Sequence, residues 1–183
     1  MNDNFNASRF WAYLTKLLVE RWRTNLLRLA ILFGCLLIIE LWISSVSYDR
    51  DETSYDRAAG ILLPIFSIIL LVSGCFFASE MLSGARRKAE RIGALTFPVT
   101  PFENWLARWT ISIPLYLVCF LVCMYVADGL RVAFFSAIYP KTSIAFISIW
   151  RGEDFDREVL FNAWLVYFWC TAVYALGSIL FVK

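Results

Sequence analysis

Long apolar blocks separated by short charged stretches constrain this chain more than any other feature of its sequence. A helix needs ~20 predominantly apolar residues to cross a bilayer. Such a block suits a helix because a helix satisfies its own backbone hydrogen bonds in lipid. Of the 183 residues, 60% are hydrophobic, well above the ~45–50% of ordinary soluble domains. The blocks predict four transmembrane helices, at about 29–46, 58–81, 110–127 and 160–182.

A further apolar segment, residues 130–150, is interrupted by Pro140 and Lys141. Neither half reaches spanning length, so we interpret the segment as an interfacial or re-entrant piece rather than a fifth crossing. No loop exceeds about 35 residues, which is too short to build a core of its own. We therefore expect a single transmembrane domain over residues 1–183.

The N-terminal segment 10–28, FWAYLTKLLVERWRTNLLR, has apolar residues at helical spacing, with Lys16, Glu20 and Arg23 on another face. This pattern predicts an amphipathic helix lying on the membrane surface before the first span. The alternative is a plain cytoplasmic extension of the first transmembrane helix. The segment carries too many charges for a secretory signal, so the first span is expected to be retained. The predicted fold is therefore an all-α polytopic membrane protein with four transmembrane helices and an N-terminal amphipathic interfacial helix.

The orientation follows from the lysine and arginine residues outside the apolar blocks. Eleven of the 17 fall in the N-terminal segment, in the loop 82–109 and at Lys183. The other six share the opposite side with nine acidic residues. Because positively charged loops stay in the cytoplasm, we expect a multi-pass membrane protein with both termini cytoplasmic.

The sequence contains little that indicates catalytic or metal-binding chemistry. The chain has no histidine, and its five cysteines lie in apolar blocks without a CxxC pair, so no metal or redox site is indicated. Neither GxxxxGK[ST] nor GxSxG occurs. We expect no enzyme activity, no cofactor and no nucleic-acid partner.

Glu40 is the ionisable residue well inside an apolar block, six positions before Val46. An acid at this depth is a candidate functional residue by default, for a substrate path or a hydrogen bond between helices. The alternatives are that it reaches toward the outer interface or sits protonated against a neighbouring helix.

The predicted cytoplasmic loop 82–109 combines a basic run with a proline-bounded turn. A short helix is expected to begin near Thr100, with Pro101 at its first position and Glu103 in its first turn. The basic run alone is explained by anionic lipid head groups, but the ordered turn indicates a docking surface for a cytoplasmic partner. The candidate contact residues are Arg86, Arg87, Lys88, Arg91, Pro98, Pro101, Glu103 and Trp105.

This loop resembles the first cytoplasmic loop of Bacteroidetes-like ABC-2 type transporter permeases. Such proteins carry a basic run followed by LxLP(A/V)(S/T)xxEK(F/W), which stands here as Leu95 to Trp105 with Asn104 in place of the lysine. The ending Leu176 to Lys183 is similar to the family's LGSxxFxK element.

The resemblance implies a permease subunit that pairs with a separate cytoplasmic ATPase and with a second permease subunit, identical or different. It also implies an amphipathic helix before the first span and a coupling helix between spans two and three. The family usually has six spans. Four spans indicate either truncation, or two spans encoded elsewhere, or a chain that keeps the fold without transport. The alternative function is a small integral membrane scaffold or assembly protein.

Overall fold

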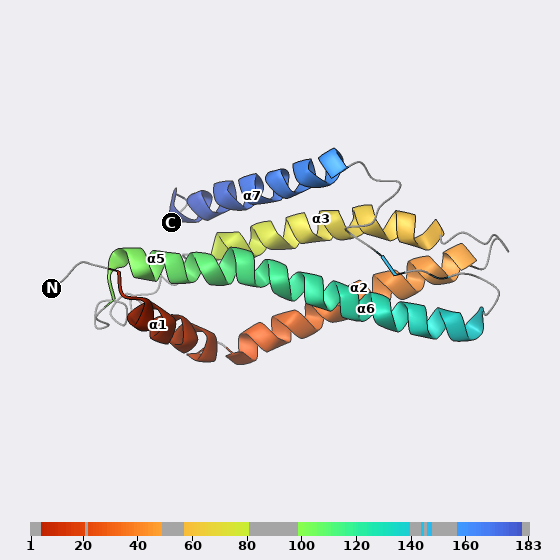
Figure 1. Cartoon of the computed structure of the whole chain (residues 1–183), viewed down its shortest axis with the longest axis horizontal. Coiled ribbons are helices and arrows are strands. Elements are labelled where there is room, and N and C mark those ends of the chain that lie inside the picture. Colours follow the sequence, from red (N-terminus) through yellow and green to blue (C-terminus); the bar gives the residue numbers. More distant parts are fainter. Residues whose placement is uncertain are drawn as a thin grey trace. The chain divides into compact units, whose positions relative to one another are not determined.

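The computed structural model describes residues 5–20, 22–48, 57–80, 99–139, 144, 146–147 and 157–180. Within these residues every regular element is a helix, as the apolar periodicity predicts. In chain order (Figure 1) the elements are α1 (Ala7–Glu20), α2 (Trp22–Tyr48), α3 (Arg57–Glu80), α5 (Pro101–Thr110), the π turn η2 (Ile111–Leu115), α6 (Tyr116–Ile138) and α7 (Arg157–Leu180).

Among the described residues, three helical stretches are long and apolar enough to cross a membrane, namely Trp22–Ser47, Gly60–Ser79 and Pro101–Ile138. They correspond to the first three predicted spans. The fourth prediction falls on α7, whose apolar part, Phe161–Gly177, is shorter. The confirmed architecture is therefore an all-helical chain with three candidate membrane spans, and the count of four stays a prediction.

Several predicted boundaries were too narrow. The first span was predicted to begin at residue 29, but α2 begins at Trp22 and takes over the end of the predicted amphipathic segment. Arg23 and Arg28 do not interrupt it, because a long charged side chain on a helix end can extend toward water while the backbone stays helical. The described helix before it is α1, Ala7–Glu20, and an amphipathic helix lying on the membrane surface stays a prediction.

The third predicted span, 110–127, is the middle of a helical stretch that runs from Pro101 to Ile138. Its 38 residues are nearly twice the ~20 that a crossing requires. The part with Glu103, Asn104 and Arg108 is polar, so we place α5 outside the membrane-spanning segment. Residues 101–109 are helical, in agreement with the helix start predicted near Thr100 within the loop 82–109.

The π turn η2 lies between α5 and α6 and contains Pro114. Proline has no backbone N–H and cannot make the usual bond to the carbonyl four residues back. A π turn, in which bonds span five residues, is a common way to absorb such a local irregularity without ending the helix.

The segment 130–150 divides between two structures. Leu130 to Ile138 continue α6 as helix, which corrects the interpretation of that half as an interfacial or re-entrant piece. Further along, the backbone N–H of Ile147 donates to Asp128 Oδ2 at 2.7 Å, and Phe146 lies 3.9 Å from the position of a Cβ at Gly129. Residues 146 and 147 thus return alongside the body of α6, ten residues before its end, as a re-entrant piece would.

The chain divides into two compact units. Unit 1 combines residues 1–26, 71–118 and 165–183, and unit 2 combines residues 27–70 and 119–164. In unit 1, the Tyr116 hydroxyl donates to Ser73 Oγ at 2.6 Å and its ring stacks on Phe77 with centroids 4.3 Å apart. These contacts join α3 to the start of α6.

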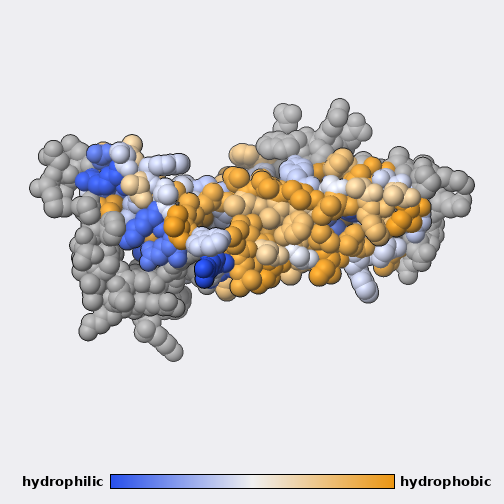
Figure 2. Space-filling view, turned by 90° about the horizontal axis from the view of Figure 1, so that it is seen from below, coloured by the Kyte–Doolittle hydropathy of each residue, from blue (hydrophilic) through white to orange (hydrophobic). Residues whose placement is uncertain are grey.

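Large apolar side chains lie on the outside of these helices rather than only in the interior. In α6, Val118, Val122, Phe134 and Ile138 are all at least half exposed, and Figure 2 shows in orange how widely such side chains cover the face in view. Exposed apolar area on this scale is unusual for a soluble monomer and suits helices surrounded by lipid.

Candidate functional site

The start of α5 is fixed by a capping box. Thr100 Oγ1 accepts a hydrogen bond from the backbone N–H of Glu103 at 3.2 Å, and Glu103 Oε2 accepts one from the N–H of Thr100 at 3.0 Å. Pro101 occupies the first turn, where its missing N–H costs nothing. The predicted helix start is confirmed, and the reciprocal bonds satisfy two N–H groups that the helix end leaves unpaired.

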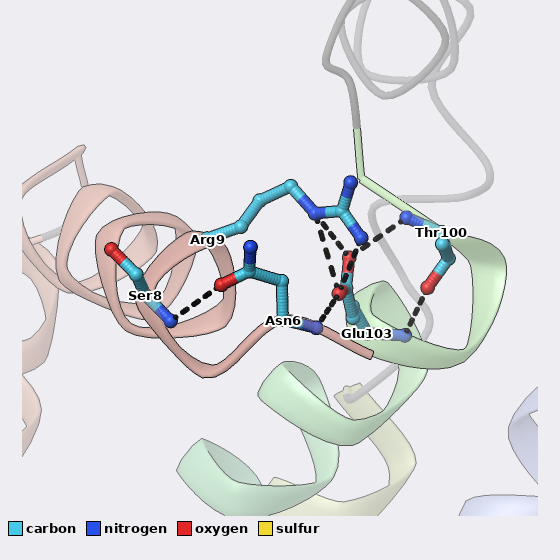
Figure 3. Close-up of polar contacts among 5 residues, drawn as sticks. All are labelled: Asn6, Ser8, Arg9, Thr100 and Glu103. Atoms are coloured by element: carbon cyan, nitrogen blue, oxygen red, sulfur yellow. Dashed lines mark hydrogen bonds and ion pairs between the residues drawn. The ribbon is translucent and has the colours of Figure 1, made fainter. Parts of the chain in front are cut away.

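The Glu103 carboxylate also binds α1, as Figure 3 shows. Arg9 Nη2 donates to Oε1 at 2.8 Å and Arg9 Nε donates to Oε2 at 3.1 Å. The backbone N–H of Asn6 donates to Oε1 at 2.9 Å. Glu103 is fully buried, and both of its oxygens are occupied. Two-pronged contact between a guanidinium and a carboxylate is strong and directional, so this residue fixes α1 against the first turn of α5.

Asn6 connects the two helix starts. Its side-chain Oδ1 accepts from the N–H of Ser8 at 3.0 Å, which is the bonding of a helix N-cap, while its own N–H binds Glu103 (Figure 3). The beginnings of α1 and α5 are therefore held by one shared set of bonds.

An apolar contact extends the junction. Tyr13 and Leu14 of α1 are buried against Ala107 of α5, and the small side chain of Ala107 allows this close approach. The Tyr13 hydroxyl donates to Asn104 Oδ1 at 3.0 Å. We call the residues of this contact the α1–α5 junction: Asn6, Arg9, Tyr13, Leu14, Thr100, Glu103, Asn104 and Ala107.

The junction changes the acidity of Glu103. The hydrogen bonds from the Arg9 guanidinium, and then that from the Asn6 N–H, stabilise the charged carboxylate and lower the pKa of Glu103 from about 4.5 to about 2. Desolvation acts in the opposite direction and is outweighed. At neutral pH the junction therefore contains a full negative charge that matches Arg9.

The predicted contact residues have different positions. Pro101 is exposed, and Trp105 is 44% exposed in a row with Phe102 and Trp109, whose ring centroids lie 6.2 and 6.4 Å from that of Trp105. Glu103 faces α1, so the prediction that it contacts a partner directly is replaced by a positioning role. The remaining predicted residues lie outside the described part of the chain: Arg86, Arg87, Lys88, Arg91 and Pro98.

A second group of polar side chains is buried in unit 2. Arg131 Nε donates to Asp128 Oδ1 at 2.8 Å, and both side chains are fully buried. The predicted third span, 110–127, places Asp128 and Arg131 in the loop that follows it, whereas both lie within the helix α6. Glu40 is also fully buried, so the interpretation in which it reaches the interface is wrong.

The sequence predicts the helix start at Thr100 but not the partners of these side chains. The reciprocal bonds of Thr100 and Glu103 have a local signal, because Thr-x-x-Glu is a capping-box signature. Arg9 could not have been paired with Glu103 in this way, because 94 positions separate them. Within the described residues no group of three or more His, Cys, Asp or Glu side chains is arranged to hold a metal ion.

Comparison of the chain with protein-family models, curated proteins and solved structures finds no match.

Proposed function

We propose that this chain is the membrane-spanning subunit of an ABC-2 type transporter and couples to a separate cytoplasmic ATPase. In this proposal α2, α3, the stretch from η2 through α6, and α7 are four spans of a bacterial inner membrane protein. Both termini lie in the cytoplasm, and α1 lies at the membrane surface. The basic residues of the loop 82–109 and the exposed face of α5 contact the ATPase.

The observation that carries the proposal is the α1–α5 junction. A coupling element must transmit the movement of a partner to the membrane. A flexible connection would absorb that movement. Here α5 continues into α6 as one helical stretch, and Glu103 ties α1 to its first turn. A displacement of α5 would therefore move α1 and the beginning of α6 together.

The exposed face of α5 suits a protein contact. Trp105 and Phe102 are 44% and 57% exposed, and aromatic side chains are enriched among residues that dominate binding energy at interfaces. Nearby in sequence, Arg86, Arg87 and Arg91 supply positive charge, which would guide an acidic partner surface to this face.

Co-purification with the ATPase of a neighbouring reading frame tests the proposal. The full chain should retain that ATPase in detergent. The triple reversal Arg86→Glu, Arg87→Glu and Arg91→Glu should lose it, because like charges across an interface are repulsive. Reversal of Arg50 and Lys141, predicted for the opposite side, should leave the complex intact.

Trp105→Ala provides a finer test. We expect at least about tenfold weaker ATPase binding, since truncating a central aromatic residue commonly costs this much. Trp42→Ala is the matched control, because Trp42 is 71% exposed on the apolar helix α2. A stable complex that contains no ATPase, with no effect of the charge reversals, would instead support a scaffold or assembly protein.

A further inference from the structure

Unit 2 buries an acidic side chain whose bonding is incomplete. Both oxygens of Glu40 and the hydroxyl of Ser44 have no hydrogen-bond partner among the described residues, and both side chains are fully buried. The two residues are four positions apart on α2, so they lie on one face of the helix, which also buries Leu36. Three oxygen atoms for which the described residues offer no hydrogen-bond partner therefore belong to the same buried face.

Two charged side chains of α6 act on Glu40 in the described part of the chain. Asp128 and Arg131 of α6 are close enough to interact with it electrostatically. Asp128 is already satisfied, because Oδ1 accepts from Arg131 and Oδ2 from the Ile147 N–H. The charges of Arg131 and Asp128 offset each other, so an ionised Glu40 would leave these three described side chains with one negative charge in excess. An uncompensated charge in a low-dielectric interior is costly.

We propose that Glu40 and Ser44, beside the Asp128–Arg131 pair, form a binding site for one monovalent cation inside unit 2. A single positive charge would neutralise the cluster. Carboxylate and hydroxyl oxygens are the ligands that hard cations prefer, which makes a sodium ion a suitable occupant. A proton on Glu40 would supply the same charge, and the experiment separates the two sources.

The site is independent of the ATPase and of coupling through α5. Its residues are on α2 and α6, and intramembrane acids on such helices commonly mark ion or proton pathways. The inference can therefore fail while the transporter proposal holds, and the reverse is also true.

Sodium-dependent thermal stability tests the site. The full chain is purified in detergent in choline chloride, which is then exchanged for sodium chloride at constant ionic strength and neutral pH, and Tm is followed by tryptophan fluorescence. Once the sodium concentration exceeds the Kd of the site, we expect Tm to rise by about 3–5 °C for each further tenfold increase in sodium. Glu40→Gln, which keeps the shape without the charge, should show no rise.

Ser44 offers a matched pair of variants. Ser44→Ala should weaken the binding of radioactive sodium by about tenfold, because one oxygen ligand is lost. Ser45→Ala should leave it unchanged, since Ser45 is exposed and its hydroxyl donates to the Trp42 carbonyl at 2.9 Å. This pair keeps the site testable even if Glu40→Gln does not fold.

A series between pH 8 and about pH 5 without sodium tests the proton. If the proton is the occupant, sodium has no effect, Tm of the wild type rises as the pH falls, and Glu40→Gln removes that rise. The pH range lies above the titration of Glu103, whose pKa is about 2. Identical responses of the wild type and Glu40→Gln to both sodium and pH, or equal sodium binding by Ser44→Ala and Ser45→Ala, would overturn the proposal.

Discussion

The two compact units each bury a glutamate completely, but they treat it in opposite ways. In unit 1, Glu103 accepts bonds from Arg9, from the Asn6 N–H and from the Thr100 N–H. In unit 2, neither oxygen of Glu40 has a hydrogen-bond partner among the described residues. Buried polar groups in native proteins are nearly always satisfied, and an exception requires an explanation. The two glutamates are equally buried, so their hydrogen bonding distinguishes them. Glu103 holds two helices together, whereas Glu40 is suited to binding a ligand.

The largest effect is expected from Glu103→Ala, which removes the hydrogen bonds that distinguish Glu103 from Glu40. It leaves Arg9 and two backbone N–H groups without their acceptor, so α1 should separate from α5. Trypsin cleavage at Lys16 should become more than about tenfold faster, since a single charge-assisted hydrogen bond is worth about that factor. Glu20→Ala is the control, because Glu20 is exposed at the end of α1. Unchanged cleavage in Glu103→Ala would show that the apolar contact holds α1 without the carboxylate.

Acid should reproduce part of that effect. The folded-state pKa of Glu103 is lowered to about 2 from about 4.5, so its stabilisation is fully present above pH ~4.5 and is lost as the pH falls toward 2. The difference in Tm between the wild type and Glu103→Gln should therefore be constant from neutral pH to about 5 and shrink below that. A constant difference down to pH 2 would mean that the carboxylate is not held in its charged form.

Close packing in unit 1 provides a third, smaller test. A Cβ added at Gly74 would lie 2.6 Å from Cε2 of Tyr167, so the tyrosine ring must shift in Gly74→Ala. Overpacking of this kind costs about 1–3 kcal/mol, measurable as a lower Tm in detergent. Gly34→Ala is the matched control, because nothing lies within 4 Å of its added Cβ. Equal Tm values for the two variants would indicate that α7 is not tightly packed on α3.

The smallest effect is expected at Glu40. In sodium-free buffer near neutral pH, Glu40→Leu should change the free energy of unfolding by less than about 1 kcal/mol or stabilise the chain, because no hydrogen bond is lost. Asp128→Leu is the contrasting variant, since it leaves Arg131 and the Ile147 N–H without their acceptor. If Glu40→Leu is as destabilising as Asp128→Leu, Glu40 has a structural partner after all.

Features that depend on residues close together in the sequence are predicted correctly. Features that depend on the packing of side chains in the folded chain are not. The start of α5 was predicted because its signals, Thr100, Pro101 and Glu103, lie within four residues of one another. The end of α6 was missed because Asp128 and Arg131 look like the polar end of an apolar block. They are instead three positions apart on a helix and neutralise each other, which allows the helix to continue to Ile138.

For the same reason, the sequence predicts only some residues of each candidate site. Glu40 was recognised as unusual because its own block is apolar. Its surroundings on α6 and the partner of Glu103 on α1 depend on tertiary packing, which a single sequence does not encode in any local pattern. The membrane character was predictable because it depends on composition and length alone, whereas the number of spans depends on how α7 is placed.

The separation of Arg9 and Glu103 by 94 positions also has a consequence in time. A ribosome adding ~5–20 residues per second would make Arg9 roughly 5–20 s before its partner exists. During that interval two apolar helices, α2 and α3, are synthesised and must enter the bilayer. The apolar face of α1 is thus made long before the surface that covers it. The junction therefore cannot close before both α2 and α3 have been synthesised.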